Sequence, residues 1–588
     1  MGKNGSRGMS DKKTLRRRTA LTAVGVAVSV MILGGKLVDI QVVNAEALQK
    51  KSESAKEDST TLYGDRGDIV DDSGKVLATT IYTYTAQASP SDAVAKGRER
   101  MVQAAAKIGA ITGQGGDAVV ALFDEALKEN PKSKYVLIKS GMGVTTFDKL
   151  DKLPYPWLTF TKTQARSYPN GAVAGNLLGY VSQSGNGGLE ASENSCLAGQ
   201  NGVQTYQRGA DGVAIPGSTV VQKATKDGGT VRLTIDSDLE WFAEQTLAQQ
   251  VRATGSTFGF VTVAEAKTGK IKAVAQYPSL DPNNISATDP SYWNLLPFTD
   301  PYEPGSTFKA LTAAMLIDQG KASPTSQVLA PYEWKSGNGA DLHDSGYHAP
   351  LRLTLTGVLM MSSNTGMSQL GRALSDQTRY DYLKKFGIGE DTGLPYPGQS
   401  DGILRPVGDW DDQTKYATMF GQGVSATQLQ MVGAYQALAN GGARIPLTMV
   451  ESCTQPDGKE KTLPKPQPVP VVSPQAAATT LGMMESVVTK GELKRQLQIP
   501  GYRVAAKTGT AQQPDGKGGY LPSYYVSVMG IAPLDDPQYV VSVNLGYPTT
   551  ITSSAAAAPL FHTIMSQVLK TYRVKPSTSG PADYPPYY

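Results

Sequence analysis

Histidine and cysteine are both scarce in this sequence. Only three histidines occur among 588 residues, His343, His348 and His562, so a zinc site with several imidazole ligands is nearly excluded. We predict neither a metal nor another cofactor. The two cysteines, Cys196 and Cys453, lie far apart in the sequence, and we expect them in different domains. Two free thiols are therefore predicted rather than a disulfide.

The chain also lacks a broad excess of charge. Its 56 basic and 52 acidic residues leave a net charge of +4, of which the first 18 residues carry about +6 and the remainder about −2. A near-neutral body offers no electrostatic footprint for nucleic acid, so we expect no nucleic-acid partner. The tail over 1–18 contains the acid Asp11 and seven basic residues: Lys3, Arg7, Lys12, Lys13, Arg16, Arg17 and Arg18.

One long hydrophobic run follows this tail. Thr19–Gly35 carries no charge, and the apolar character continues to Val43 if Lys36 extends its ammonium toward the membrane surface. A cleaved signal peptide would have a similar pattern, but no convincing cleavage site ends the run. We therefore predict a transmembrane anchor over 19–43 in the plasma membrane. The basic flank places the N-terminus in the cytoplasm and everything after about residue 40 outside.

The remaining chain predicts an α+β protein in two parts. Residues 50–225 are interpreted as an elongated mixed domain without evident catalytic chemistry, with helices near 91–109 and 117–129. Residues 226–574 predict an antiparallel sheet flanked by helices, and residues 575–588 a disordered tail. The sheet prediction rests on an apolar hairpin (258–264 and 271–276), a late strand pair (524–531 and 539–545) and a last helix (555–572).

Ser306 and Lys309 form the first candidate catalytic pair. Pro304-Gly305 predicts a turn and an apolar stretch follows Lys309, so Ser306 would start a helix with Lys309 on the same face one turn later. A serine hydroxyl needs a neighbouring base, and lysine can serve when burial lowers its pKa. Alone the motif is weak, because about two Ser-x-x-Lys matches are expected by chance. Ser10-Asp-Lys-Lys13 is indeed a second match.

Two further motifs follow in a specific order. Ser362-Ser-Asn364 comes after the apolar, helix-compatible stretch Leu353–Met361, and Lys507-Thr-Gly-Thr510 comes after a short apolar run that suits a strand at the edge of a cleft. An earlier Lys-Thr-Gly at 267–269 precedes Ser306 and fits a hairpin turn, so we discard it. The order Ser-x-x-Lys, Ser-x-Asn, Lys-Thr-Gly is that of the penicillin-recognising serine enzymes.

With these motifs the chain resembles the class B penicillin-binding proteins, most closely the FtsI-like division transpeptidases. The resemblance runs from the anchor to the last helix and implies a dimerisation or pedestal domain over 50–225 and a transpeptidase domain over 226–574. Gln422 and Glu492 depart from the usual pattern only in loop detail. Further matching stretches are Arg66-Gly-x-Ile-x-Asp71, Arg166-x-Tyr-Pro169, Tyr302-Glu-Pro-Gly-Ser306 and Phe420-Gly-Gln-Gly-Val-Ser-Ala-Thr-Gln-Leu-Gln430.

The resemblance implies a role for each catalytic residue. Ser306 would attack the carbonyl of a D-Ala-D-Ala stem peptide and form an acyl-enzyme, and Lys309 would take the Ser306 proton. Ser362 would relay a proton to the leaving D-Ala amine. Asn364 would orient the donor amide and Lys309, and Lys507 would support Ser362 electrostatically.

The resemblance also implies how substrates and partners bind. Thr508, Gly509 and Thr510 would form the substrate-binding strand, with the two threonines on the substrate carboxylate. Backbone N–H groups of Ser306 and Thr510 would form the oxyanion hole. The implied partners are peptidoglycan stem peptides, β-lactam antibiotics, a SEDS-type glycosyltransferase and other membrane proteins of the divisome.

Several other functions deserve comparison with this interpretation. A bifunctional class A enzyme is rejected because 50–225 shows no glycosyltransferase signature, and a β-lactamase would need a deacylating carboxylate that we do not identify. An elongation-type transpeptidase and a D,D-carboxypeptidase remain open. A non-catalytic divisome scaffold is disfavoured because all the motif residues are present.

Overall fold

The computed structural model describes residues 8–44, 46, 57–182, 184–208, 215–461, 463, 466–514 and 519–588. The α+β class is confirmed, and the chain divides into two compact units. One unit contains the chain up to residue 64 together with 199–226, and the other contains 65–198 and 227–588. Lys3 and Arg7 of the basic tail lie outside the described residues.

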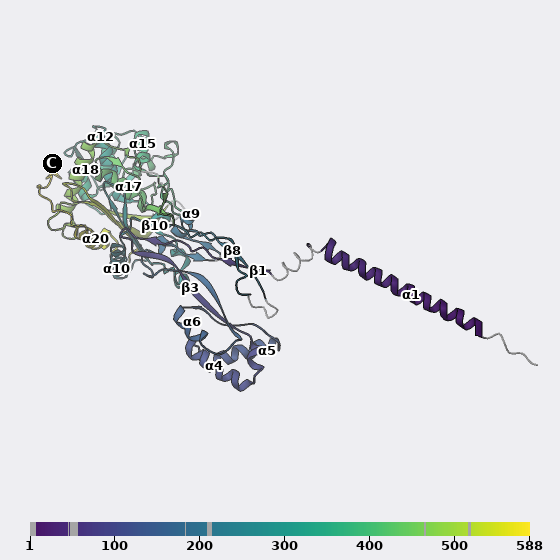
Figure 1. Ribbon diagram of the computed structural model, residues 1–588. Helices are drawn as coiled ribbons and strands as arrows, with labels where there is room; N and C mark the ends of the chain where they lie inside the picture. Colours follow the sequence, from purple (N-terminus) through teal and green to yellow (C-terminus); the bar gives the residue numbers. More distant parts are fainter. Residues whose placement is uncertain are drawn as a thin grey trace, which may run out of the picture. The chain divides into compact units, whose positions relative to one another are not determined.

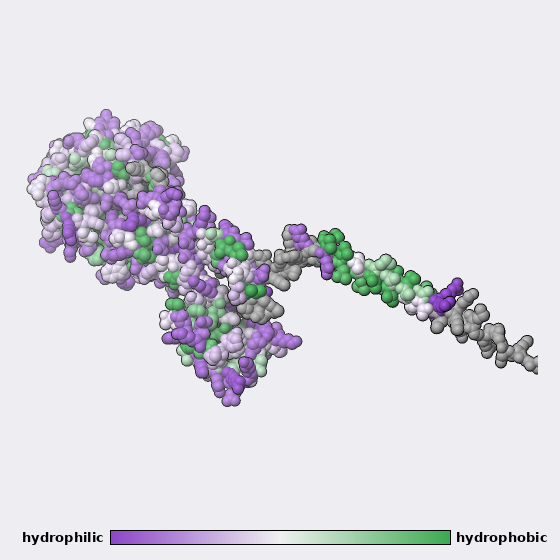
Figure 2. Space-filling view, viewed as in Figure 1, coloured by the Kyte–Doolittle hydropathy of each residue, from purple (hydrophilic) through white to green (hydrophobic). Residues whose placement is uncertain are grey.

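Helix α1 (Gly8–Val38) is the first described element and continues into a π-helical turn over Asp39–Val43. Among the described residues, Arg16–Val43 is the one helical stretch long and apolar enough to cross a membrane. Figure 2 shows hydrophobic residues along most of this stretch after a hydrophilic start. A helix suits such a stretch because it satisfies its own backbone hydrogen bonds in lipid. The same unit contains an antiparallel sheet of β1 (Glu57–Leu62), β8 (Gly202–Gln207) and β9 (Val220–Lys223).

The second unit begins with a sheet covered by helices α4, α5 and α6 (Figure 1), around a small core that includes Phe123. The helix predicted over 91–109 is interrupted: a short helix ends at Val94, and α4 starts after Gly97, whose φ of 105° is not helical. The helix predicted over 117–129 is confirmed as α5. The elements are β3 (Val76–Ala88), α4 (Arg98–Thr112), α5 (Gly116–Glu129), β4 (Val136–Met142), α6 (Val144–Asp151) and β5 (Leu158–Ser167).

A five-stranded antiparallel sheet forms the centre of the larger part of this unit, with the strand order β12-β11-β23-β22-β21. The predicted hairpin, late strand pair and last helix are all confirmed. Side chains alternate between the two faces: Val541 and Val543 join the core under α10 and α20, and Val540 joins the core that includes α17. The elements are α10 (Ser237–Thr254), β11 (Phe258–Glu265), β12 (Ile271–Tyr277), α17 (Gln428–Ala439), β21 (Ala505–Pro514), β22 (Tyr520–Ala532), β23 (Tyr539–Gly546) and α20 (Ala558–Thr571).

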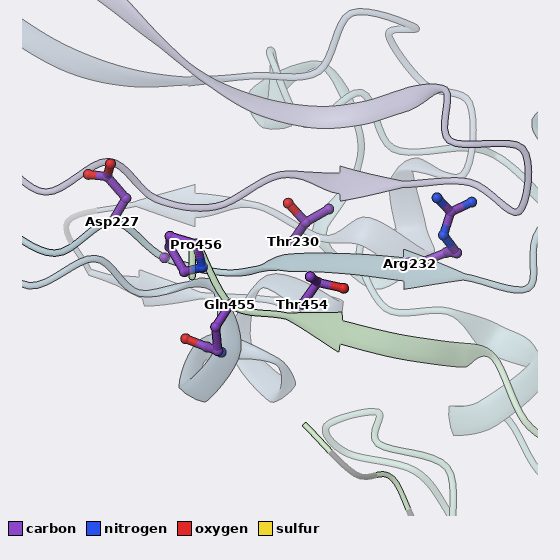
Figure 3. A pocket seen from close by; sticks show the side chains of 7 residues that line it. Asp227, Thr230, Arg232, Thr454, Gln455 and Pro456 are labelled. Carbon is purple, nitrogen blue, oxygen red and sulfur yellow. The ribbon is translucent and has the colours of Figure 1, made fainter. Parts of the chain in front are cut away.

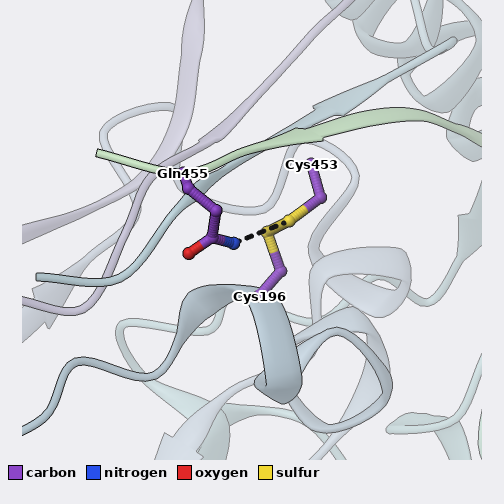
Figure 4. The surroundings of a disulfide bond; sticks show 3 residues. All are labelled: Cys196, Cys453 and Gln455. Atoms are coloured by element: carbon purple, nitrogen blue, oxygen red, sulfur yellow. Dashed lines mark hydrogen bonds between the residues drawn. A yellow bond between two sulfur atoms is a disulfide. The ribbon is translucent and has the colours of Figure 1, made fainter. Parts of the chain in front are cut away.

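Cys196 and Cys453 form a disulfide (Figure 4), so the prediction of two free thiols was wrong. Their separation of 257 residues in the sequence conceals their proximity in space. The Gly229 N–H donates to the Cys196 carbonyl at 2.8 Å, and Val231 pairs with Cys453 across the neighbouring strands β10 and β18. The strand that begins beside Cys196 therefore brings both sulfur atoms together within one unit. The strands are β10 (Thr230–Leu233) and β18 (Val450–Thr454).

Residues 575–588 contradict the prediction of a disordered tail. The Thr354 N–H donates to the Pro586 carbonyl at 3.1 Å, just before helix α13 (Leu355–Met361). Gly357 in the first turn of α13 leaves room for this contact, because a Cβ there would lie 1.9 Å from the Pro586 oxygen. The prediction of disorder rested on the position of the tail at the end of the chain, but its backbone carbonyls bind the start of a helix.

Removing the disulfide is expected to lower stability without unfolding the protein. A bond that closes so long a loop typically stabilises by about 2–4 kcal/mol. The double variant Cys196→Ser/Cys453→Ser should therefore unfold at a lower temperature than the oxidised protein in thermal denaturation. Reductant should lower the midpoint of the parent protein and leave the variant unchanged. Equal midpoints, or two alkylatable thiols in the unreduced parent, would contradict the bond.

Candidate active site

Ser306 lies in the first turn of a helix, as the motif predicted. A short 3₁₀ turn, η4 (Gly305–Phe308), leads directly into α12 (Lys309–Asp318), which places Lys309 one turn beyond Ser306. The Lys309 Nζ donates to the Ser306 Oγ at 2.9 Å. Ser306 is half-buried and Lys309 is fully buried. A hydroxyl on a half-buried residue and a fully buried amine are thus held in direct contact.

The loop after Phe420 supports the Ser306 turn from behind. The Gly305 N–H donates to the Gly421 carbonyl at 2.9 Å. Gly421 has a φ of 82°, and a Cβ there would lie 2.3 Å from the Gly305 oxygen, so only glycine fits this approach. The end of the same motif starts α17, where Thr427 and Gln430 form a capping box. The motif residues from 420 to 430 therefore fix the turn that carries Ser306.

The Lys309 amine is surrounded by oxygen acceptors in a buried site. Besides Ser306, its Nζ donates to the Ser362 carbonyl at 2.6 Å and to the Asn364 Oδ1 at 2.7 Å. Burial lowers the pKa of Lys309 to about 7, against the charge of Asp344, which acts to raise it. The amine can therefore be neutral near pH 7, which is the form that accepts a proton.

Ser362 occupies the junction between two helices. It follows the last residue of α13, and Ser363 caps the next helix, α14 (Asn364–Gly371), where its Oγ accepts from the Gly366 N–H at 2.9 Å. Ser362 itself has a φ of 58°, a left-handed conformation that costs energy for a residue with a side chain. The sharp turn directs the Ser362 carbonyl and hydroxyl toward the two lysines.

Lys507 comes from the edge strand β21 and approaches Ser362 from the other side. Its Nζ donates to the Ser362 Oγ at 3.0 Å and to the Thr508 carbonyl at 3.1 Å. The Lys309 Nζ lies 3.4 Å from the same Ser362 Oγ. Burial and the neighbouring Lys309 charge hold the pKa of Lys507 well below its usual value. The Ser362 hydroxyl therefore links two amines, which gives a continuous path for a proton.

The other three predicted residues continue along β21. Thr508 contacts Lys507 through its Oγ1 at 3.4 Å. Gly509 packs against the Ser306 turn, where a Cβ would lie 3.1 Å from the Pro304 oxygen. Thr510 is held through its Oγ1, which accepts from the Ser554 N–H at 3.2 Å. The structure thus brings all eight predicted residues to one place, with Thr510 outside the network of the two lysines.

Sequence reasoning missed Asp344 and His348. Asp344 is buried, and its carboxylate accepts hydrogen bonds from the backbone N–H groups of Asn364 and Thr365. His348 contacts the other oxygen of that carboxylate at 2.9 Å. The available signal was weak: an Asp-x-x-x-His pair in a loop, twenty residues before Asn364. Because the chain has only three histidines, His348 was the more informative residue of the pair.

A surface hollow elsewhere in this unit has no comparable chemistry. Its volume is about 430 Å³, and it lies over strands β10 and β18 (Figure 3). Its two charged residues are already bonded within the protein: the Asp227 Oδ1 accepts from the Asp65 N–H, and the Arg232 Nη1 donates to the Asp72 carbonyl. The hollow is lined by Asp227, Gly228, Thr230, Arg232, Thr454, Gln455 and Pro456.

The arrangement at Ser306 suits acyl transfer through a covalent intermediate. A half-buried hydroxyl touches an amine that can be neutral, and a second hydroxyl connects this amine to another lysine. Such a set can remove a proton from a nucleophile and deliver one to a leaving group. No imidazole takes part in these contacts.

Comparison with known families places two models on the chain. The model for the penicillin binding protein transpeptidase domain matches residues 259–566. The model for the penicillin-binding protein dimerisation domain matches residues 61–233. The two matches cover most of the second unit together with strands β8 and β9 of the first.

Several curated and solved proteins are similar to this chain. Penicillin-binding protein PbpB of Mycolicibacterium smegmatis is 32% identical, over 96% of this chain and 91% of the relative. PbpB of Mycobacterium tuberculosis is 36% identical, over 71% of this chain and 64% of the relative. Peptidoglycan D,D-transpeptidase FtsI of Escherichia coli is 27% identical, over 96% and 94%. The crystal structure of penicillin binding protein 3 from M. tuberculosis with aztreonam matches with a TM-score of 0.68 and 28% identity, over 90% of this chain and 99% of that chain.

The Lys309 amine is expected to titrate near pH 7. Burial lowers its pKa from the ordinary value of 10.5 to about 7, so the side chain should be protonated below that pH and neutral above it. NMR spectra of the protein with ¹³C-labelled lysine should show one resonance with this midpoint, absent from the Lys309→Met variant. If the resonance that the variant lacks titrated near pH 10, the buried-amine description would be wrong.

Proposed function

This chain belongs to the class B penicillin-binding proteins, and we propose that it is a peptidoglycan D,D-transpeptidase which cross-links stem peptides through an acyl-enzyme on Ser306. One observation carries the proposal: the buried Lys309 amine lies 2.9 Å from the Ser306 hydroxyl, with Ser362, Asn364 and Lys507 around it. Penicillin-binding protein 3 of M. tuberculosis has been solved with aztreonam and with ampicillin. We accordingly propose that β-lactams acylate and inhibit this protein.

Acylation begins when Ser306 gives its proton to the neutral Lys309 amine and its Oγ bonds to the carbonyl carbon of the donor peptide. Backbone N–H groups of Ser306 and Thr510 bind the oxyanion of the tetrahedral intermediate. The intermediate collapses as the bond to the terminal D-Ala nitrogen breaks. Ser362 gives its proton to this nitrogen and recovers one from Lys309, across the 3.4 Å contact between them.

Transfer to the acceptor follows the same path in reverse. The amine of a neighbouring stem peptide attacks the acyl carbon and loses a proton through Ser362 and Lys309, and the Ser306 hydroxyl is restored. Lys507 supports Ser362 during these steps by the hydrogen bond from its Nζ to the Ser362 Oγ at 3.0 Å. Thr508 and Thr510, together with Gly509, bind the donor's terminal carboxylate along strand β21.

A D,D-carboxypeptidase would use the same residues, with water as the acceptor. The match to the transpeptidase-domain model favours the transpeptidase, and so does the similarity over 96% of this chain to a relative named peptidoglycan D,D-transpeptidase FtsI. The intact proton path disfavours a scaffold without catalysis. A labelled stem peptide distinguishes the two reactions. A transpeptidase converts it to a cross-linked peptide, and a carboxypeptidase converts it to the shortened peptide with a free carboxylate.

Membrane attachment supports the placement of the active site outside the cell. Arg16, Arg17 and Arg18 stand at the start of the apolar stretch, which favours a cytoplasmic N-terminus in the plasma membrane. The Cys196–Cys453 bond fits an oxidising compartment for the rest of the chain. We propose that the anchor and the first domain outside the membrane contact a SEDS-type glycosyltransferase and other divisome proteins.

The penicillin adduct tests both the nucleophile and the base. Mass spectrometry after treatment with benzylpenicillin should place one adduct on Ser306. Ser306→Ala should abolish it, and Lys309→Ala should slow acylation by about 10²–10⁴-fold, because a general base is lost. Ser10→Ala, which removes the serine of the other Ser-x-x-Lys match, is the control and should react like the parent. Labelling at another residue, or none in folded protein, would refute the proposal.

Localisation tests the division role against elongation. A fluorescent protein fused to the N-terminus should accumulate at septa, as expected for a relative of FtsI. Depletion of the protein should then give cells that grow without dividing. Uniform fluorescence along the side wall, with loss of cell shape on depletion, would favour an elongation enzyme.

A further inference from the structure

We propose that Asp344 and His348 form a positioning pair that fixes Asn364 and adjusts the basicity of the Lys309 amine; this inference rests on the proposed function. Both residues lie in the loop between β15 (Asp341–His343) and β16 (Leu351–Thr354), upstream of the Ser-x-Asn motif. Neither belongs to the three motifs that define the site. Their contacts lead to the catalytic amine in two steps.

The first step is the attachment of Asn364. The Asp344 Oδ1 accepts from the Asn364 N–H and, at 3.0 Å, from the Thr365 N–H, so the carboxylate binds the first turn of α14. His343, the residue before Asp344, holds the Asn364 side chain, because the Asn364 Nδ2 donates to the His343 carbonyl at 2.9 Å. The loop therefore fixes both the backbone and the amide of Asn364.

The second step is the orientation of the acceptor at Lys309. Because the Asn364 Nδ2 is bound to the His343 carbonyl, the Oδ1 faces the Lys309 Nζ at 2.7 Å. A flipped amide would point an N–H donor at an amine that already donates. The loop thus determines that Lys309 meets an oxygen here, and so keeps its Nζ within 2.9 Å of Ser306.

Charge gives Asp344 a second effect on the same amine. Lys507, which shares the Ser362 hydroxyl with Lys309, is the other titratable group beside this amine, and Asp344 is the charged residue that acts on the Lys309 pKa. Asp344 is only 6% exposed, so water screens its charge weakly. Its negative charge offsets part of the effect of burial and keeps Lys309 basic enough to take a proton from serine.

His348 completes the pair because both of its ring nitrogens face oxygen atoms. The Nε2 lies 2.9 Å from the Asp344 Oδ2, and the Nδ1 lies 2.8 Å from the Ala349 carbonyl. A neutral imidazole has one donor and one acceptor, so only the protonated ring satisfies both contacts. Burial acts to lower the pKa of His348, but these two hydrogen bonds outweigh it and raise the pKa. Tyr332, the other group packed on the ring, carries no charge.

Acylation by benzylpenicillin as a function of pH tests the pair. In the parent protein the rate should rise with pH through about 7, as Lys309 loses its proton. Asp344→Asn can keep the hydrogen bonds while it removes the charge, so the midpoint of this rise should move to lower pH. Its maximal rate should fall less than that of Asp344→Ala, which should lose at least about tenfold because Asn364 is released.

His348→Gln should move the midpoint in the opposite direction, because a positive charge beside Asp344 is removed. The control is Asp341→Asn, which removes the same charge from an exposed residue in β15 that is paired with Lys335, and it should leave the profile unchanged. If thermal denaturation shows that Asp344→Asn is not folded, the shift of the acylation midpoint in His348→Gln tests the pair instead. Unchanged midpoints in these variants, with the parent still acylated, would refute the pair; a parent that is not acylated at Ser306 would instead refute the proposed function.

Discussion

Two amines, those of Lys309 and Lys507, are withdrawn from water in the same cleft, and the rest of the site is arranged around that constraint. Removing an ammonium from water costs several kcal/mol, and two neighbouring positive charges add to the cost. Oxygen acceptors offset part of this cost. The Ser362 carbonyl and the Asn364 amide oxygen accept from Lys309, and the Thr508 carbonyl accepts from Lys507. Burial nevertheless lowers both pKa values, and the neighbouring Lys309 charge lowers that of Lys507 further. The left-handed Ser362 and the approach of Gly421 to Gly305 are the local costs of placing these groups.

Local patterns in the sequence predicted the parts of the site that depend on neighbouring residues. The helical spacing placed Lys309 beside Ser306, and apolar runs separated by turn residues predicted the hairpin and the late strands of the central sheet. The assembly of three motifs from distant segments followed from their order, by resemblance to a family. Asp344 escaped prediction because a single carboxylate in a loop has no periodicity, and its partners lie about twenty residues further along the chain.

Long-range contacts account for the errors. The pairing of Cys196 with Cys453 depends on strand β10 lying between them in space, which spacing along the chain does not reveal. The tail after residue 575 was predicted to be disordered because it follows the last helix at the end of the sequence. It is ordered because Thr354 and Gly357 provide a matching surface far upstream in the sequence. In both cases the decisive contact joins segments that lie far apart in the sequence.

The path of the C-terminal segment has a practical consequence for protein engineering. Tyr588 ends against Arg352, next to the strand that leads into α13, and Tyr587 contacts Met361, the residue before Ser362. An affinity tag or reporter attached after Tyr588 would disturb the contacts that Tyr587 and Tyr588 make beside α13, the helix that ends just before Ser362. Purification handles and imaging labels are therefore better placed ahead of the membrane segment.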